Sequence, residues 1–266
     1  MKKMVVAMAL MAGWAQGEVK LEVNGLRVVG KGYSAESDED AMNAEIRAFN
    51  WSPGTSVSLL FTAGELSIVA LNEKESKITS LTDDKGTDFS KAKSRFSNEP
   101  YKFGWSNVSK DGKALGTTIE ANGVPAKGAK SLIIKGEVVV TTGSKTEKVQ
   151  SGTVALKEGT TFEVGGFTFK IKRVEEPKFG DSKVSVTLET SKNMDALKEV
   201  IFLDESGEKI ESEQRGSGSF GFGGKMTYSR SFGLKKKVSE VEIGLLKWTD
   251  LKQVKVPLDL TLGVGL

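Results

Sequence analysis

Apolar side chains alternate with polar ones along most of this 266-residue chain. The alternation is longest near the C-terminus, at residues 254–262, and recurs in shorter segments at 57–61, 167–171 and 184–188. Because successive side chains of a β-strand point to opposite faces, this period of two places the apolar groups on one face of each strand. Helical periodicity is nearly absent. The pattern therefore predicts an all-β protein built from half-buried strands.

Turn-forming residues separate these strands at short intervals, and Gly, Ser, Lys and Glu predominate near residues 142–159. We expect a domain boundary there, with an N-terminal β-sandwich domain at 18–151 and a C-terminal one at 152–266. The first domain has long polar loops. The second is expected to be immunoglobulin-like or fibronectin-like, because its strand signals recur at the spacing typical of that sandwich.

The first 17 residues have the pattern of a secretory signal peptide. Lys2 and Lys3 precede an apolar stretch, and Ala15-Gln16-Gly17 has the small-x-small form of a cleavage site. The apolar stretch is shorter than the roughly 20 residues that a membrane-spanning helix needs. We therefore expect an exported protein, secreted or periplasmic, without a transmembrane segment.

The composition excludes several kinds of chemistry. The chain has no histidine and no cysteine, so histidine bases, Ser-His-Asp triads, thiolate nucleophiles, disulfides and His or Cys metal sites are excluded. The 38 basic side chains nearly balance the 35 acidic ones, which gives no reason to expect binding to nucleic acid or anionic lipid. Carboxylate pairs, Ser–Lys or Thr nucleophiles, tyrosines and oxygen-ligated cations remain.

The segment Gly216–Gly221 matches the G-x-G-x-x-G pattern of dinucleotide sites. That site requires a strand before the glycines and a helix after them, whereas here a charged polar segment precedes and another strand signal follows. We therefore predict a loop between strands. Phe220 and Phe222 are candidate binding residues in it, because exposed aromatic rings are good stacking and docking groups. The alternative is that both rings pack back onto the sandwich.

Two further segments carry aromatic side chains at alternate positions, 47–51 and 101–105. In an extended chain each set lies on one side, which suits a platform for sugar rings or for a partner's apolar side chains, with Trp51 and Trp105 as candidate binding residues. The interpretation that we favour is that both segments are strands that supply the core of the first domain.

Asp83, Asp84 and Asp88 surround a glycine turn and are candidate calcium ligands. Calcium takes six to eight oxygens, and this segment lacks the alternate acids and bidentate glutamate of an EF-hand. Backbone carbonyls would have to complete the site. The alternative is a solvated turn, and we expect no other cofactor.

Three segments, 82–88, 201–210 and 247–260, resemble predicted exported bacterial proteins of unassigned function with immunoglobulin-like sandwich domains. The second half of the chain carries most of this resemblance. It implies fold and export, and it implies no catalytic residue.

These observations favour a non-catalytic exported module that binds a protein or a glycan at the cell envelope, or has a structural role there, and acts through its sandwich loops. The alternative is a carbohydrate-active protein, either a glycan-binding module or a glycoside hydrolase with paired carboxylates.

Overall fold

The computed structural model describes residues 19–30, 53–92, 99–177 and 180–264. About 65% of these described residues are in strands and 1% are in a helix, which confirms the predicted all-β fold. The one helical element in the described part is the short 3-10 helix η1 (Phe89–Lys91). The chain forms two compact units: unit 1 comprises Met1–Thr142 with Lys252–Leu266, and unit 2 comprises Gly143–Leu251.

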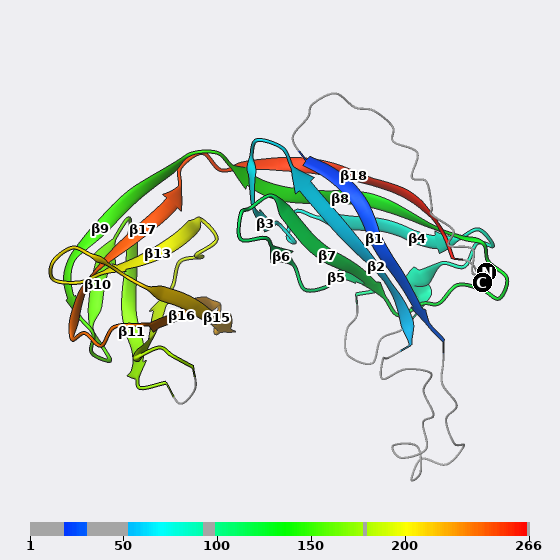
Figure 1. Ribbon diagram of the computed structural model, residues 1–266. Helices are drawn as coiled ribbons and strands as arrows, with labels where there is room; N and C mark the ends of the chain where they lie inside the picture. Colours follow the sequence, from blue (N-terminus) through cyan, green and yellow to red (C-terminus); the bar gives the residue numbers. More distant parts are fainter. Residues whose placement is uncertain (1–18, 31–52, 93–98, 178–179, 265–266) are drawn as a thin grey trace, which may run out of the picture. The chain divides into compact units, whose positions relative to one another are not determined.

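Unit 1 contains two antiparallel sheets (Figure 1). One has the order β1-β2-β7-β5, with β6 also paired to β7, and the other has the order β18-β8-β3, with β4 also paired to β8. Their strands are β1 (Val19–Val29), β2 (Gly54–Ala63), β3 (Ser67–Leu71), β4 (Lys77–Asp83), β5 (Tyr101–Phe103), β6 (Asn107–Val108), β7 (Ala114–Ala121), β8 (Ser131–Gly143) and β18 (Lys252–Gly263).

The two sheets of unit 1 share one buried core. The alternating side chains of β2 supply Val57, Leu59 and Phe61, all with no exposed surface. They belong to the same cluster as Ile134 of β8 and Leu258 of β18, which come from the other sheet. The period of two in the sequence thus becomes one apolar face per strand, and the two faces bury each other.

Unit 2 also contains two antiparallel sheets, with the orders β10-β11-β12-β16-β15 and β14-β13-β17-β9. Their strands are β9 (Thr146–Ala155), β10 (Thr161–Val164), β11 (Phe167–Glu175), β12 (Val184–Thr190), β13 (Leu197–Leu203), β14 (Lys209–Ile210), β15 (Ser212–Phe222), β16 (Lys225–Leu234) and β17 (Glu240–Trp248).

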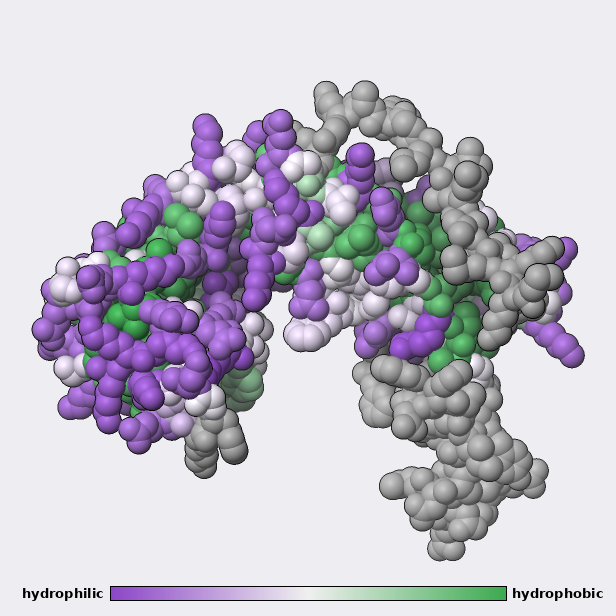
Figure 2. All heavy atoms as spheres, in the orientation of Figure 1, coloured by the Kyte–Doolittle hydropathy of each residue, from purple (hydrophilic) through white to green (hydrophobic). Residues whose placement is uncertain are grey.

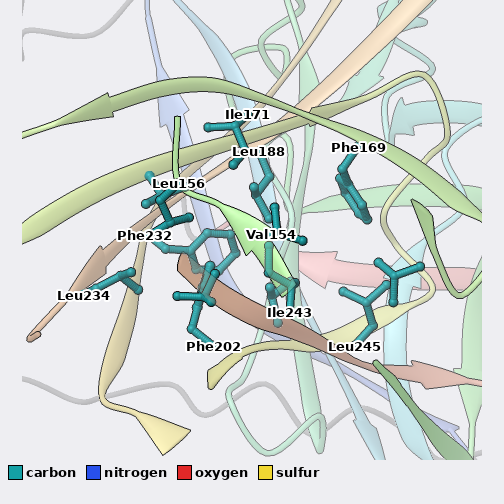
Figure 3. Packing of buried hydrophobic residues seen from close by; sticks show 14 of the residues in the cluster. Val154, Leu156, Phe169, Ile171, Leu188, Phe202, Phe232, Leu234, Ile243 and Leu245 are labelled. Atoms are coloured by element: carbon teal, nitrogen blue, oxygen red, sulfur yellow. The ribbon is translucent and has the colours of Figure 1, made fainter. Parts of the chain in front are cut away.

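The core of unit 2 is rich in aromatic rings (Figure 3). Phe202 of β13 meets Phe232 of β16 edge to face, with ring centroids 5.3 Å apart. Phe169 of β11 stacks on Phe167 of the same strand and on Phe162 of β10, at 5.5 Å in each case. The Phe202–Phe232 contact joins one strand of each sheet and so helps to hold the two layers of this unit together, whereas the Phe169 stacks lie within one sheet.

Unit 2 is inserted into unit 1. The chain leaves unit 1 after Thr142 and returns at Lys252, where β18 pairs with β8 along its whole length. The expected domains, 18–151 and 152–266, therefore differ from the structure, because the last strand belongs with the first unit. The alternation at residues 254–262 predicts a strand with one apolar face, but it does not say which strand is its neighbour.

Pro257 lies in an edge strand. A proline has no N–H for a sheet, so within a strand it is suited to an edge position or a bulge. The structure places β18 at the edge of its sheet, with Pro257 opposite Glu137. Among the described residues no helix has the length and apolar character that crossing a membrane requires.

Candidate functional site

The hairpin β15–β16 is the most exposed element of unit 2. Gly223 and Gly224 connect the two strands, with φ of 58° and 78°. Two residues with positive φ make a type I′ turn, whose twist matches that of the flanking strands. The Gly216–Gly221 segment is therefore part of a paired strand, and the predicted loop between strands is wrong there. Sequence reasoning did not use the Gly-Gly pair, which is the signal for this hairpin.

Phe220 and Phe222 are exposed to 69% and 81%, so neither ring packs back onto the sandwich. They occupy alternate positions of β15, opposite Thr227 and Lys225 of β16, and therefore lie on the same face of the hairpin. Met226 is 43% exposed and opposite Gly221, which places it on the other face. The hairpin thus carries apolar side chains on both faces, with the two rings together on one.

The alternation of β16 decides which face is which. Phe232 and Leu234 are buried in the core, so the face of β16 that they share points into unit 2. Phe220 and Phe222 belong to the opposite, outward face, as does Ser231. In the space-filling view the visible face of unit 2 is mostly hydrophilic (Figure 2). Two exposed rings side by side are therefore unusual for this unit.

Arg230 anchors the base of the hairpin. Its guanidinium donates hydrogen bonds to the main-chain oxygens of Met194, at 2.7 Å, and of Leu197, at 3.2 Å. Burial lowers the pKa of Arg230 and the nearby Asp195 carboxylate opposes that effect. Tyr228 packs against the core two residues closer to the turn. The root of the hairpin is thus fixed to the sandwich, whereas β15 is exposed along nearly its whole length.

The aromatic residues of unit 1 divide into two groups. Tyr101 and Phe103 of β5 pack against the core of unit 1, as expected if this segment is a strand that supplies that core. Trp105, two residues beyond Phe103, is 86% exposed. The three side chains therefore do not form one platform. Trp51 lies outside the described residues.

The candidate calcium turn is held by its own carboxylates. Asp83 is buried and accepts main-chain hydrogen bonds from Lys85, Thr87 and Ala126 at 2.7 to 2.9 Å. Burial raises the pKa of Asp83, but these hydrogen bonds, that of Ala126 first, outweigh it and leave the pKa below its ordinary value. This carboxylate therefore has a structural role that accounts for its burial.

The two neighbouring carboxylates also bind main-chain N–H groups. Asp84 accepts hydrogen bonds from Lys130 and Ser131, and Asp88 caps η1 by accepting one from Ser90. In the described ranges no three acidic side chains are grouped as a metal site. The structure thus does not bring Asp83, Asp84 and Asp88 together as the calcium hypothesis requires, because each satisfies a different part of the backbone.

Comparison with protein-family models, curated proteins and solved structures found no match for this chain. The resemblance to exported bacterial proteins and the immunoglobulin-like character of the second half therefore stay predictions. Function has to be argued from the exposed hairpin of unit 2 and from the exposed Trp105 of unit 1.

Proposed function

We propose that this protein is an exported, non-catalytic binding module that docks to another protein through the outward face of the β15–β16 hairpin. The observation that carries the proposal is the exposure of Phe220 and Phe222 on one face of a rigidly rooted hairpin. Aromatic side chains supply much of the binding energy of protein interfaces when a partner buries them.

The energetic argument is simple. Burying a phenylalanine side chain is worth about 1.5 to 3 kcal/mol relative to leaving it in water. Both rings are mostly exposed in the free chain, so a partner that covers them gains most of this energy. The hairpin root is already fixed by the Arg230 hydrogen bonds, so docking orders little additional chain. A hairpin that is fixed in advance is suited to specific docking.

The non-catalytic part of the proposal rests on what the perturbed carboxylates do. Hydrogen bonds hold the pKa values of Asp83, Asp204 and Asp250 below the ordinary value. Each of the three accepts hydrogen bonds from neighbouring main-chain N–H groups. A general acid needs a raised pKa, so these groups have the wrong shift for that role. Export rests on the signal-like pattern of residues 1–17.

To test the proposal, the mature chain is immobilised at low density and incubated with envelope and culture-supernatant fractions. The double variant Phe220→Ala/Phe222→Ala is compared with the wild type and with Trp105→Ala, a matched removal of an exposed ring in unit 1. We expect at least one protein to be retained by the wild type and by Trp105→Ala and lost from the double variant. Equal retention by all three chains contradicts the proposal.

A second candidate function is carbohydrate binding through Trp105. Its support is the 86% exposure of this indole, since tryptophan faces stack on sugar rings. A glycan array distinguishes the two functions. Saturable binding that Trp105→Ala removes and the Phe220/Phe222 double variant keeps favours the carbohydrate function, and no binding above background rejects it.

A further inference from the structure

The outer edge of β15 is unusual among the sheet edges of the described part. Strand β15 is the last strand of its sheet, and its residues Gly216–Phe222 contain no charged residue and no proline. Edge strands are normally protected against pairing by charges, proline, bulges or short length. Gly216–Phe222 has none of these protections, because the bulge of β15 lies before it, between Gln214 and Gly216.

Most other edges are protected in these ways. Lys20 and Glu22 lie on β1, Glu147 and Lys148 on β9, and Pro257 with two lysines on β18. The strands β5, β10 and β14 are only 3, 4 and 2 residues long. Strand β3, which ends the β18-β8-β3 sheet, is uncharged and five residues long, but none of its residues is exposed. The outer half of β15 is thus an exposed edge without these protections, which indicates that it pairs with a further strand.

The turn fixes which main-chain groups face outward. A two-residue turn is closed by a hydrogen-bonded pair, here Phe222 and Lys225, and such pairs alternate along an antiparallel ladder. The N–H and C=O groups of Ser217, Ser219 and Gly221 therefore point away from β16. They are available to a further strand alongside β15.

We propose that this further strand is β15 of a second copy of the chain, paired antiparallel about Ser219. This inference rests on the proposed function and names the partner. In that register Ser219 lies opposite the partner's Ser219, and Ser217 lies opposite the partner's Gly221. The three outward-facing residues of each strand then bond one another, and the two hairpins form one continuous four-stranded ribbon.

Side-chain shape selects this register. A two-fold axis at Ser219 places Phe220 opposite the partner's Gly218 and Phe222 opposite the partner's Gly216. All of these residues lie on the outward face. Each ring covers a glycine of the other copy, an arrangement that stabilises strands containing glycine. On the other face only Ser217, Ser219 and Gly221 meet, so no bulky groups collide.

Charge and area set the expected strength. The paired stretch carries no charge, so the two copies bring no like charges into contact. The two rings of each copy expose roughly 300 Å². A standard interface buries roughly 800 Å² per partner, so the rings and one strand pair give a weak, concentration-dependent dimer. Association is expected to be isologous, with one two-fold axis.

The absence of cysteine from the chain allows a direct test of the register. In an antiparallel pair, opposite residues have Cα atoms about 5.5 Å apart, within the range that a disulfide spans. Ser219→Cys is therefore expected to form an interchain disulfide under mild oxidation. Ser217→Cys is the matched control, since its two copies lie on opposite sides of the axis and out of reach. Mixing Ser217→Cys with Gly221→Cys is expected to restore the cross-link.

Sedimentation equilibrium from about 10 µM to about 1 mM gives the second readout. The wild type is expected to dimerise with rising concentration and Phe220→Ala/Phe222→Ala to stay monomeric. Equal cross-linking of Ser219→Cys and Ser217→Cys, or a wild type that is monomeric throughout, overturns self-pairing. If another protein is nevertheless retained in a Phe-dependent way, the proposed function stands and only the identity of the partner is wrong. If neither is found, both proposals fail.

Discussion

Asp250 binds Ser144 twice, accepting one hydrogen bond from its main-chain N–H at 2.9 Å and another from its hydroxyl at 2.5 Å. The same carboxylate accepts the N–H of Lys145 at 2.8 Å. Ser144 lies just after the chain enters unit 2, and Asp250 just before it leaves. One carboxylate thus ties together the two segments that join unit 2 to the rest of the chain.

This arrangement predicts a pH dependence for the stability of unit 2. The Ser144 hydroxyl, with the N–H groups of Lys145 and Ser144, lowers the pKa of Asp250 to about 2. The unfolded chain has the ordinary value of about 3.9, so the stabilisation is complete above that value and is lost as the pH falls through about 2.

Asp250→Asn tests this dependence by thermal melting between pH 7 and pH 2. The variant should melt below the wild type at neutral pH, and the difference should shrink as the pH approaches 2. Asp259→Asn, which changes an exposed carboxylate of β18, is the control and should leave the midpoint unchanged. A difference that stays constant with pH would show that the charge of Asp250 is not the cause.

In the turn of unit 1, replacing Asp83 is expected to lower the free energy of unfolding more than replacing Asp88. Asp83→Ala leaves the N–H groups of Lys85, Thr87 and Ala126 without their acceptor in a buried place, and should lower the free energy of unfolding by about 2 to 4 kcal/mol. Asp88→Ala removes a single solvent-accessible cap of η1 and should cost clearly less. Urea denaturation measures both, and equal losses would contradict this assignment.

The same hydrogen bonds predict the response to calcium. Since the carboxylates of Asp83, Asp84 and Asp88 are directed at separate main-chain groups, millimolar calcium should not bind the folded turn. A ligand that binds only the folded state raises the melting temperature. We therefore expect the same midpoint in calcium and in chelator. A rise in calcium that Asp84→Asn removes would restore the metal hypothesis.

Arg230 should prove important for stability although it lies on an exposed hairpin. Arg230→Met keeps an apolar stem but leaves the oxygens of Met194 and Leu197 without a donor, at an expected cost of about 1 to 3 kcal/mol. Arg173→Met is the matched control, because the Arg173 side chain is 63% exposed and should change stability by less than about 0.5 kcal/mol. Chemical denaturation measures the free energy of unfolding of both variants, and equal values would contradict the anchoring role of Arg230.

Much of the fold could be predicted because the alternation is a local property of the sequence. It identifies the apolar face of residues 254–262, and Pro257 indicates an edge. The neighbour of that strand could not be predicted, because β8 lies more than 100 residues earlier in the chain. The insertion of unit 2 depends on this one non-local pairing, so the predicted domain boundaries were wrong at the C-terminus.

The candidate site was predictable only in part. Phe220 and Phe222 were identified from their aromatic character, and their exposure follows from a hairpin that the Gly223-Gly224 turn indicates. Met226 and Arg230 were missed, because a sequence shows neither which residue lies across a strand pair nor which carbonyls a guanidinium reaches. The role of Asp83 was also hidden, since three acids near a glycine look alike until their hydrogen bonds are known.

Hydrogen exchange tests docking by the hairpin most directly. The exchange of main-chain amides would be measured by mass spectrometry in the free mature chain and in its complex with the retained partner, or in its concentrated dimer. Docking through the outward face of the β15–β16 hairpin predicts slower exchange at residues 212–228 and unchanged exchange at 101–108. Unchanged exchange in the hairpin, with slowing elsewhere in the chain, would contradict the account.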